Sequence, residues 1–249
     1  MNLVNIDETL DDLQLNGIHI IQKKEGFRFG VDAVLLANFA KVKKGGTVVD
    51  LCTGTGIIPF IIKGKSQCGL IRGLEIQGEF VEMAKRSVVY NKFENQIEFI
   101  EADLKNHEIL REIGRVDVVT VNPPYKLYNS GILNDKDKNA IARHEICCTL
   151  EDVVAAARIL LKDNGKLYMV HRPERLVDIF NLMRQYRIEP KRIKFIHPKP
   201  DKAPNIVLIE GQRDGGQFLK VEDPIYIHNE DNSYSKKIEE IYSSTNLSI

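Results

Sequence analysis

The chain has 249 residues, 43% of them hydrophobic, and its 35 lysine and arginine residues are balanced by 35 aspartate and glutamate residues. This length allows one large α/β domain or one domain with an appendage, and the hydrophobic content is ordinary for a globular protein. The zero net charge excludes a bulk-basic binder of the histone kind, so any nucleic-acid surface must be a local patch.

Cysteine spacing and hydropathy exclude further classes of protein. The four cysteines are Cys52, Cys68, Cys147 and Cys148. None forms a C-x-x-C pair, so we expect no metal site, and so few cysteines in a chain this large fit a reducing, cytoplasmic location. Residues 1–15 are acidic and lack the apolar core of a signal peptide. The longest clearly apolar stretch, residues 57–62, is too short to cross a bilayer, so we expect no membrane partner.

Strand-like and helix-like patterns alternate along the chain. We expect a loose lead over residues 1–16, a hairpin within residues 17–29, and a helix over residues 31–40. The expected strands cover residues 47–51, 70–76, 97–101, 116–121, 165–170, 192–197 and 206–210. The expected helices cover residues 56–63, 79–91, 105–113, 150–161 and 173–186. The alternation predicts an α/β fold with a doubly wound, mostly parallel, seven-stranded sheet over residues 31–228, followed by a tail at 229–249. Ligands of such a fold bind beyond the carboxyl ends of the strands.

A glycine turn follows the first expected strand of the sheet, in the segment Asp50-Leu51-Cys52-Thr53-Gly54-Thr55-Gly56. Gly54 and Gly56 permit a sharp turn and a close backbone approach to a ligand, and the next helix offers free N–H groups. The segment lacks the third glycine of the dinucleotide fingerprint and the Gly-Lys-Ser/Thr of a P-loop. Taken alone, the turn is a weak indication of a nucleotide site.

Two acidic residues end the next two strands. Glu75, roughly 20 residues beyond the glycine turn, is placed to accept hydrogen bonds from the two hydroxyls of a ribose. Asp103 is placed to accept one from an adenine amine. Each has a plainer alternative, an exposed strand-end carboxylate for Glu75 and a helix N-cap for Asp103. The neighbouring Ile76 and Leu104 belong to the same predicted cofactor site.

The segment Asn122-Pro123-Pro124-Tyr125 follows the apolar strand at residues 116–121. The two prolines fix their φ angles and hold the preceding residues extended, so the carbonyl group of Pro123 is held rigidly and free to accept a hydrogen bond. The Asn122 side chain offers a second acceptor, and the Tyr125 ring offers a stacking face. These groups suit the –NH2 of adenine, cytosine or a glutamine side chain. The plain alternative is a proline-rich turn that merely ends a strand.

The order of these segments, each at the end of a successive strand, resembles the class I S-adenosylmethionine-dependent methyltransferases, and within them the amino-methyltransferases. The resemblance covers roughly residues 25–210. The segment from Phe29 to Asp32 and the turn running on to Pro59 are similar to those of the bacterial valine-tRNA adenine-N6-methyltransferase family, whose members methylate an adenine beside the anticodon.

The resemblance implies S-adenosylmethionine as cofactor, S-adenosylhomocysteine as product and tRNA as substrate. It also implies cofactor contacts from Asp50, Gly54, Gly56, Glu75 and Asp103, and a catalytic grip on the acceptor amine from residues 122–125, with Asn122 also beside the cofactor. Gly30 and Asp32 would lie against the methionine end of the cofactor, although Asp32 is equally suited to cap a helix. In one departure, Cys52 occupies the first glycine position of the family's turn.

Two other functions remain open on the sequence. A protein glutamine-N5 methyltransferase shares Asn-Pro-Pro-Tyr, but such proteins usually carry a sizeable helical domain before the cofactor turn, and here 49 residues precede Asp50. The other is a domain that binds cofactor or RNA without transferring a methyl group. A DNA adenine methyltransferase would need a target-recognition domain, for which the chain has no room.

Polar segments beyond the motif are candidates for substrate contact. Residues 126–146 are polar and follow the motif directly, which suits either a segment that closes over substrate or a solvated loop. A later basic region is suited to phosphate contact or to a plain solvated face, and its members are Lys191, Arg192, Lys194, Lys199, Lys202 and Arg213. No general base is required for this chemistry, so we expect His144 and His171 to be surface or capping residues.

Overall fold

The structure is a computed structural model that describes residues 3–25, 30–123 and 148–243. Its strands are β1 (Glu8–Asp12), β2 (His19–Lys23), β3 (Val48–Leu51), β4 (Ile71–Glu75), β5 (Ile97–Glu101), β6 (Val116–Val121), β7 (Leu161–His171), β8 (Ile188–His197), β9 (Ile206–Arg213) and β10 (Lys220–Tyr226). Its helices are α1 (Val31–Phe39), α2 (Ile57–Lys65), α3 (Gly78–Asn91), α4 (His107–Ile113), α6 (Leu150–Leu160), the 3-10 helix η1 (Pro173–Arg175), α7 (Leu176–Gln185) and α8 (Lys236–Ser243).

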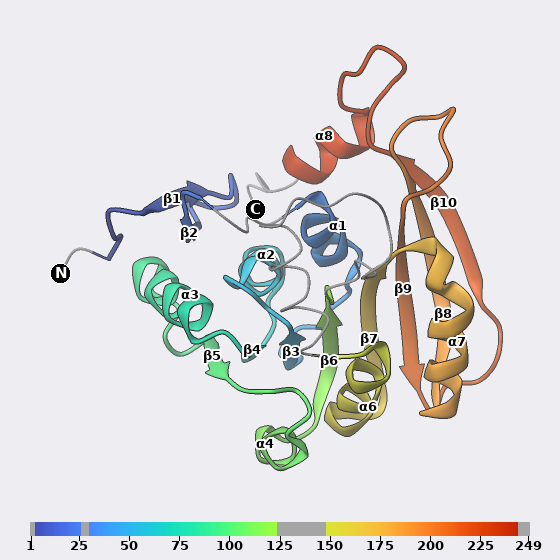
Figure 1. Ribbon diagram of the computed structural model, residues 1–249, viewed down its shortest axis with the longest axis horizontal. Helices are drawn as coiled ribbons and strands as arrows, with labels where there is room; N and C mark the ends of the chain where they lie inside the picture. The colour runs from blue at the N-terminus through green and yellow to red at the C-terminus, as the bar shows by residue number, and fades with distance from the viewer. Residues whose placement is uncertain (1–2, 26–29, 124–147, 244–249) are drawn as a thin grey trace, which may run out of the picture.

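The main sheet has the strand order β10-β8-β9-β7-β6-β3-β4-β5 (Figure 1). The strands from β3 to β7 pair in parallel, whereas β9 is antiparallel to both β7 and β8. The doubly wound, mostly parallel fold is therefore confirmed. The sheet has eight strands where seven were expected, because β10 pairs in parallel with β8 at the edge. β10 is mostly exposed and contains Pro224, a pattern that suits an edge strand and hides its strand character in the sequence.

Helices cover both faces of the sheet and define two hydrophobic cores. The first core joins the sheet to α1, α2, α3 and the C-terminal α8, which contributes Ile238 and Ile241. The second core joins the opposite face to α4, α6 and α7. The strands that lie between these layers are buried on both faces, as β3 (four buried residues) shows, and the parallel arrangement accounts for their largely apolar sequences.

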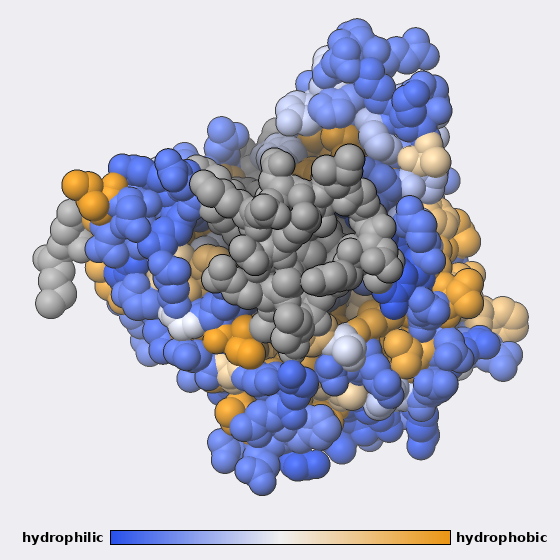
Figure 2. Space-filling view, in the orientation of Figure 1, coloured by the Kyte–Doolittle hydropathy of each residue, from blue (hydrophilic) through white to orange (hydrophobic). Residues whose placement is uncertain are grey.

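The described surface is mostly hydrophilic, and Figure 2 shows apolar surface along the edge of the molecule that carries α7 and β10. Val177, Phe218 and Val221 are exposed apolar residues on or beside these elements. Among the described residues, no helix is both long enough and apolar enough to span a membrane.

The expectation of a loose lead over residues 1–16 is wrong, because β1 lies within it and pairs with β2 as an antiparallel hairpin. The hairpin was expected further along, and its predicted end at Phe27 and Phe29 lies outside the described residues. The strand β1 is hidden in the sequence because its inward residue is a carboxylate, Glu8, which is only 4% exposed.

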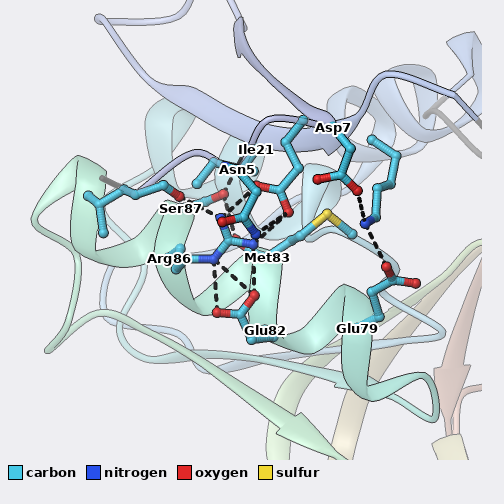
Figure 3. A network of polar contacts seen from close by, with 11 residues as sticks. Asn5, Asp7, Ile21, Glu79, Glu82, Met83, Arg86 and Ser87 are labelled. Atoms are coloured by element: carbon cyan, nitrogen blue, oxygen red, sulfur yellow. Dashed lines mark hydrogen bonds and ion pairs between the residues drawn. The ribbon is translucent and has the colours of Figure 1, made fainter. Parts of the chain in front are cut away.

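Arg86 on α3 fixes the hairpin to the domain (Figure 3). Its guanidinium donates to both carboxylate oxygens of Glu8 at 2.7 Å and also pairs with Glu82 on its own helix at 2.7 Å. A second bridge runs from Lys23 on β2, whose ammonium lies 2.7 Å from both Asp7 and Glu79. Hydrogen bonds from Arg86, the main cause, hold the pKa of Glu8 at about 2, well below its ordinary value of 4.5.

Glu8→Gln should lower the free energy of unfolding at pH 7 by about 3 kcal/mol, because it leaves the mostly buried guanidinium of Arg86 without its main anionic partner. The matched control is Glu82→Gln, which removes an exposed partner of the same arginine and should cost less than about 1 kcal/mol. Because the folded pKa of Glu8 is depressed, its contribution is present above pH 4.5 and is lost as the pH falls towards 2. Urea unfolding at several pH values measures both effects, and equal losses in the two variants would contradict the anchoring role.

Candidate active site

The carboxyl ends of β3, β4, β5 and β6 meet along one edge of the sheet. Leu51 at the end of β3 is paired with Leu74 on one side and with Val121 on the other, and Glu75 is paired with Glu101. The chain order runs outward from β3 through β4 and β5, and in the other direction through β6 and β7. The topological switch therefore lies between β3 and β6, which is where such sheets bind ligands.

The turn after β3 depends on left-handed backbone at three positions. Cys52, Gly54 and Gly56 have φ angles of 54°, 57° and 88°. Gly56 caps α2, and a side chain there would collide with the ring of Phe99 on β5. Only glycine satisfies both conditions at Gly56, whereas Cys52 tolerates a left-handed φ at some cost. The position where the family resemblance expects glycine is therefore one where the backbone favours it.

Asp50 supports this turn from below. Its side chain is 0% exposed, and its two carboxylate oxygens accept hydrogen bonds of 2.6 Å from the hydroxyls of Thr53 and Thr120. The carboxylate is enclosed by protein, and contact between Asp50 and the cofactor stays a prediction. Burial, opposed by these two hydrogen bonds, raises the pKa of Asp50 to about 7. Asp50 is thus a positioning residue that joins the turn to β6.

Glu75 closes the other side of the turn. One of its carboxylate oxygens accepts from the Gly54 N–H at 3.0 Å, and the other accepts from the Gln77 N–H at 3.1 Å. The carboxylate is 6% exposed, so the alternative of an exposed strand-end group is wrong. The next residue, Ile76, is 41% exposed, which leaves an apolar side chain beside a carboxylate with lone pairs to spare. This pairing fits a ribose and its attached base.

Asp103 follows β5 at the same edge and has a half-exposed side chain. It accepts from the Lys105 N–H at 2.9 Å, and its neighbour Leu104 is buried in the second core. The alternative that Asp103 caps α4 is wrong, because Asn106 is the cap and accepts from the Glu108 N–H at 3.1 Å. Contact of Asp103 with an adenine amine stays a prediction.

Gly30 and Asp32 lie at the start of α1. Gly30 is the N-cap residue, so the alternative that Asp32 caps this helix is wrong. Asp32 lies in the first turn, and one of its carboxylate oxygens accepts from the Ala33 N–H at 3.1 Å. Their placement against the methionine end of a cofactor stays a prediction.

Asn122 and Pro123 follow β6 directly, beside the turn after β3. The Asn122 side-chain oxygen is buried and has no hydrogen-bond partner among the described residues. A buried acceptor without a partner costs about 1–3 kcal/mol, so a residue that keeps one is a candidate for ligand contact. Pro123 is buried, whereas Pro124 and Tyr125 lie outside the described residues, as does the predicted closing segment at 126–146.

His171 ends β7 and is buried at 4% exposure, so the expectation of a surface residue is wrong. Burial, assisted by the nearby charge of Arg175, lowers the pKa of His171 to about 4, and its Nδ1 accepts from the Arg172 N–H at 2.8 Å. The ring is therefore neutral at pH 7. His144 lies outside the described residues.

A shallow hollow between α7 and the start of β8, lined by Phe180, Arg184 and Leu219 among others, is a separate feature. It lies at the opposite, amino edge of the parallel strands, so it is no part of this site. Among the described residues, no cluster of three or more histidine, cysteine or acidic side chains could hold a metal ion.

A doubly wound sheet with a glycine turn, a ribose-type acid and an unpaired amide oxygen at its switch point defines a class I methyltransferase. The chain belongs to the methyltransferase small domain family, whose model matches residues 29–186. The protein is an enzyme that uses S-adenosylmethionine as its cofactor.

Curated relatives and solved structures agree with this assignment. A Porphyromonas gingivalis protein named tRNA1(Val) (adenine(37)-N6)-methyltransferase is 28% identical over 74% of this chain and 73% of its own length. A Tolumonas auensis protein of the same name is 26% identical over 87% of this chain and 89% of its own length. The crystal structure of a predicted O-methyltransferase from Agrobacterium tumefaciens matches with a TM-score of 0.68 at 21% identity, over 88% of this chain and 98% of that chain, which shows the shared fold.

The residues present fit this cofactor. Glu75 would hold the ribose hydroxyls, Ile76 would cover one face of the adenine, and the left-handed turn at Gly54 would admit the cofactor close to the backbone. The unpaired oxygen of Asn122 lies beyond β6 on the other side of the switch point, where an acceptor amine can meet it.

Two positioning residues escaped the sequence reasoning. Thr53 and Thr120 hold Asp50, and both are buried. The available signal was Thr120 itself, a lone hydroxyl in the run Val118–Val121, whose four residues are all buried. A buried hydroxyl needs a partner, and the sequence placed a buried acid on the neighbouring strand.

Asp50→Asn should change the pH dependence of stability. The pKa of Asp50 is raised on folding from 3.8 to about 7, so the stabilising effect of its protonated form is fully present below pH 3.8 and lost as the pH rises through 7. Relative to Asp50→Asn, the wild type should lose about 2–4 kcal/mol between pH 4 and pH 8 in urea unfolding.

Asp117→Asn on the same β6 strand is the control of opposite sign. Burial alone would raise the pKa of Asp117, but the Thr47 N–H at 2.8 Å and the Lys162 ammonium at 2.9 Å lower it. Its contribution should therefore be lost as the pH falls. Parallel pH profiles of the wild type and Asp50→Asn would show that Asp50 is ionised when buried, against this account.

Glu75→Ala should weaken S-adenosylhomocysteine binding by about 1–3 kcal/mol, because the ribose hydroxyls lose their acceptor and the turn loses the tie to Gly54. The matched control is Glu98→Ala on β5, whose exposed carboxylate pairs with Arg72 at 2.8 Å and should leave affinity unchanged. Titration calorimetry measures both. An unchanged affinity in folded Glu75→Ala protein would remove Glu75 from the cofactor site.

Proposed function

We propose that this enzyme methylates the exocyclic N6 of adenine in tRNA. The observation that carries the proposal is the unpaired, buried oxygen of Asn122 beside the cofactor turn. The proposal is supported by relatives whose name is tRNA1(Val) (adenine(37)-N6)-methyltransferase and which align over most of this chain. Because tRNA is the proposed acceptor, the cytoplasm is the proposed place of action.

The proposed reaction requires the enzyme to bind and orient a weak nucleophile, the N6 amine of adenine. The lone pair of N6 is delocalised into the adenine ring, and accepting its N–H bonds at Asn122 and at the Pro123 carbonyl would raise the electron density on nitrogen and aim it. The bound cofactor supplies a methyl group that is already electrophilic. Positioning the amine for in-line attack is then the main contribution of the protein. The methylated nitrogen is strongly acidic and loses its proton to solvent, so no basic side chain is needed.

The Asn122 oxygen lies at the end of a strand where a base inside a duplex cannot reach it. The adenine must come from an unpaired loop or be turned out of its stack. Tyr125 is proposed to stack on the base once it is there.

The basic region of the sequence divides into two groups. Arg192 is engaged within the protein by Glu210 at 2.7 Å and Glu222 at 3.1 Å, and it also lies over the ring of Phe39. Lys191, Lys194 and Arg213 likewise contact groups of the protein itself. These four therefore hold the sheet together, and they are poor candidates for phosphate contact.

Lys199 and Lys202 remain as candidates for phosphate contact. They follow β8, which runs parallel to β7, so they lie at the same edge of the sheet as Asn122. Strands are spaced by about 4.8 Å, so β8 lies three spacings, about 14 Å, across the sheet from β6. The end of β8 at His197 extends four residues past Ile193, which is level with Val121 at the end of β6. Lys202 pairs with Asp201 at 3.0 Å, and this ion pair is exposed and easily exchanged for phosphate.

The test is methyl transfer from labelled cofactor to unmodified tRNA, to a DNA oligonucleotide and to a glutamine-containing peptide, followed by nucleoside analysis. The expected product is N6-methyladenosine in tRNA alone. Asn122→Ala should lower kcat by about 100-fold or more with little change in cofactor affinity, because the Asn122 oxygen contacts the acceptor amine. The matched control, Asn181→Ala on α7 at the opposite edge of the sheet, should keep full activity.

Methylation of the peptide with tRNA untouched would replace the nucleic-acid proposal with glutamine-N5 methylation. Cofactor binding with no transfer to any of the three acceptors would favour a binding domain. Near-normal turnover by Asn122→Ala would remove Asn122 from the mechanism whichever acceptor is found.

A further inference from the structure

Two cysteine thiols meet at the cofactor turn. Cys52 and Cys148 are 96 residues apart in the sequence, yet their sulfur atoms lie 4.0 Å from one another. Both side chains are partly buried and pack against the second core. Cys68, the other cysteine that the structure describes, is buried in the first core on the opposite face of the sheet.

Each of these cysteines is held by the end of a regular element. Cys52 follows β3 directly with a left-handed φ of 54°, and the next N–H, of Thr53, donates to the Leu74 carbonyl at 3.0 Å. Cys148 precedes Thr149, whose side chain forms a capping box with Asp152 at the start of α6. The facing sulfurs are therefore a feature of the fold, and they need to approach by about 2 Å to reach disulfide length.

The surroundings shift the pKa values of the two thiols in opposite directions. The contact with the Cys52 sulfur, opposed by burial and by the charge of Asp152 and helped by Lys105, lowers the pKa of Cys148. The same contact and burial raise the pKa of Cys52. Since the thiolate is the reactive form, Cys148 is the attacking group and Cys52 the resolving one.

We propose that Cys52 and Cys148 form an oxidative modification site, at which hydrogen peroxide converts the pair to an intramolecular disulfide that weakens cofactor binding. The Cys148 thiolate attacks one peroxide oxygen, the O–O bond breaks, and the departing hydroxide takes up a proton to leave as water. The Cys52 thiol then attacks the resulting sulfenic sulfur, the S–S bond forms, and the S–O bond breaks with loss of a second water that carries the Cys52 proton. One peroxide is thus reduced as two thiols are oxidised.

The disulfide would act on the cofactor turn through the backbone. Cys52 lies between Asp50, which fixes the base of the turn, and Gly54, whose N–H donates to Glu75 at 3.0 Å. Drawing Cys52 towards the start of α6 would shift the turn in which Gly54 donates to Glu75, the group assigned to the ribose. The effect depends on the cofactor site alone and holds whichever molecule accepts the methyl group.

The test treats the purified protein with hydrogen peroxide and maps its disulfides by mass spectrometry of non-reduced peptides. The wild type should lose two hydrogens in mass, yield a linked Cys52–Cys148 peptide, and bind S-adenosylhomocysteine about tenfold more weakly in calorimetry. Dithiothreitol should restore both the mass and the affinity.

Two variants serve as controls. After peroxide, Cys148→Ser should keep the affinity it had before peroxide, and Cys68→Ser should respond as the wild type does. A bond that maps to Cys147 in place of Cys148, the absence of any bond, or an undiminished affinity of the cross-linked protein would each overturn the proposal. A peroxide-dependent loss of affinity that persists in Cys148→Ser would do so as well.

Discussion

The buried carboxyl group of Asp50 connects the two halves of the active site. One of its oxygens accepts from Thr53 in the cofactor turn, and the other accepts from Thr120 on β6, each at 2.6 Å. Thr120 lies on β6, two residues before Asn122, which follows that strand directly. The position of the cofactor turn and the position of Asn122, the proposed acceptor-binding residue, are therefore both tied to one buried side chain.

This arrangement separates support from contact. Asp50 and the two threonines lie inside the protein and bond to one another. The groups that can still bind a ligand are the remaining lone pairs of Glu75, the exposed apolar side chain of Ile76 and the Asn122 oxygen, which has no partner among the described residues. A methyl-transfer enzyme mostly has to hold two reactants in line. It therefore needs a rigid, buried support for the site and, at the surface of the site, polar and apolar groups that are free to bind the reactants.

Much of the fold could be predicted because local and global signals agree. The continuous apolar run of β6 and the alternation of strands with helices required a parallel sheet, and the strand ends then had to meet at one edge. β1 and β10 escaped prediction for a shared reason. Each lies outside the central parallel strands and owes its place to partners distant in sequence, such as Arg86 for Glu8 and β8 for β10.

The residues at the surface of the site could be predicted from the sequence, but the buried contacts that support them could not. The residues at the ends of strands could be identified from their positions in the sequence. The enclosure of Asp50 could not, because it depends on Thr120, 70 residues away, and the contact of Cys52 with Cys148 spans 96 residues. The role of most residues in the basic region also could not be predicted from the sequence. A cluster of charges in sequence says nothing of the acids opposite, and the partners of Arg192 on β9 and β10 become visible only when the sheet is assembled.

The central claim is that the Asn122 oxygen accepts a hydrogen bond from the amine of the acceptor. The most direct measurement is a crystal structure of the protein with S-adenosylhomocysteine and a tRNA anticodon stem-loop. The account predicts that the Asn122 oxygen lies about 2.7–3.2 Å from N6 of the turned-out adenine, with Glu75 on the cofactor ribose. An adenine amine bound elsewhere, with the Asn122 oxygen paired to a group of the protein itself, would contradict it.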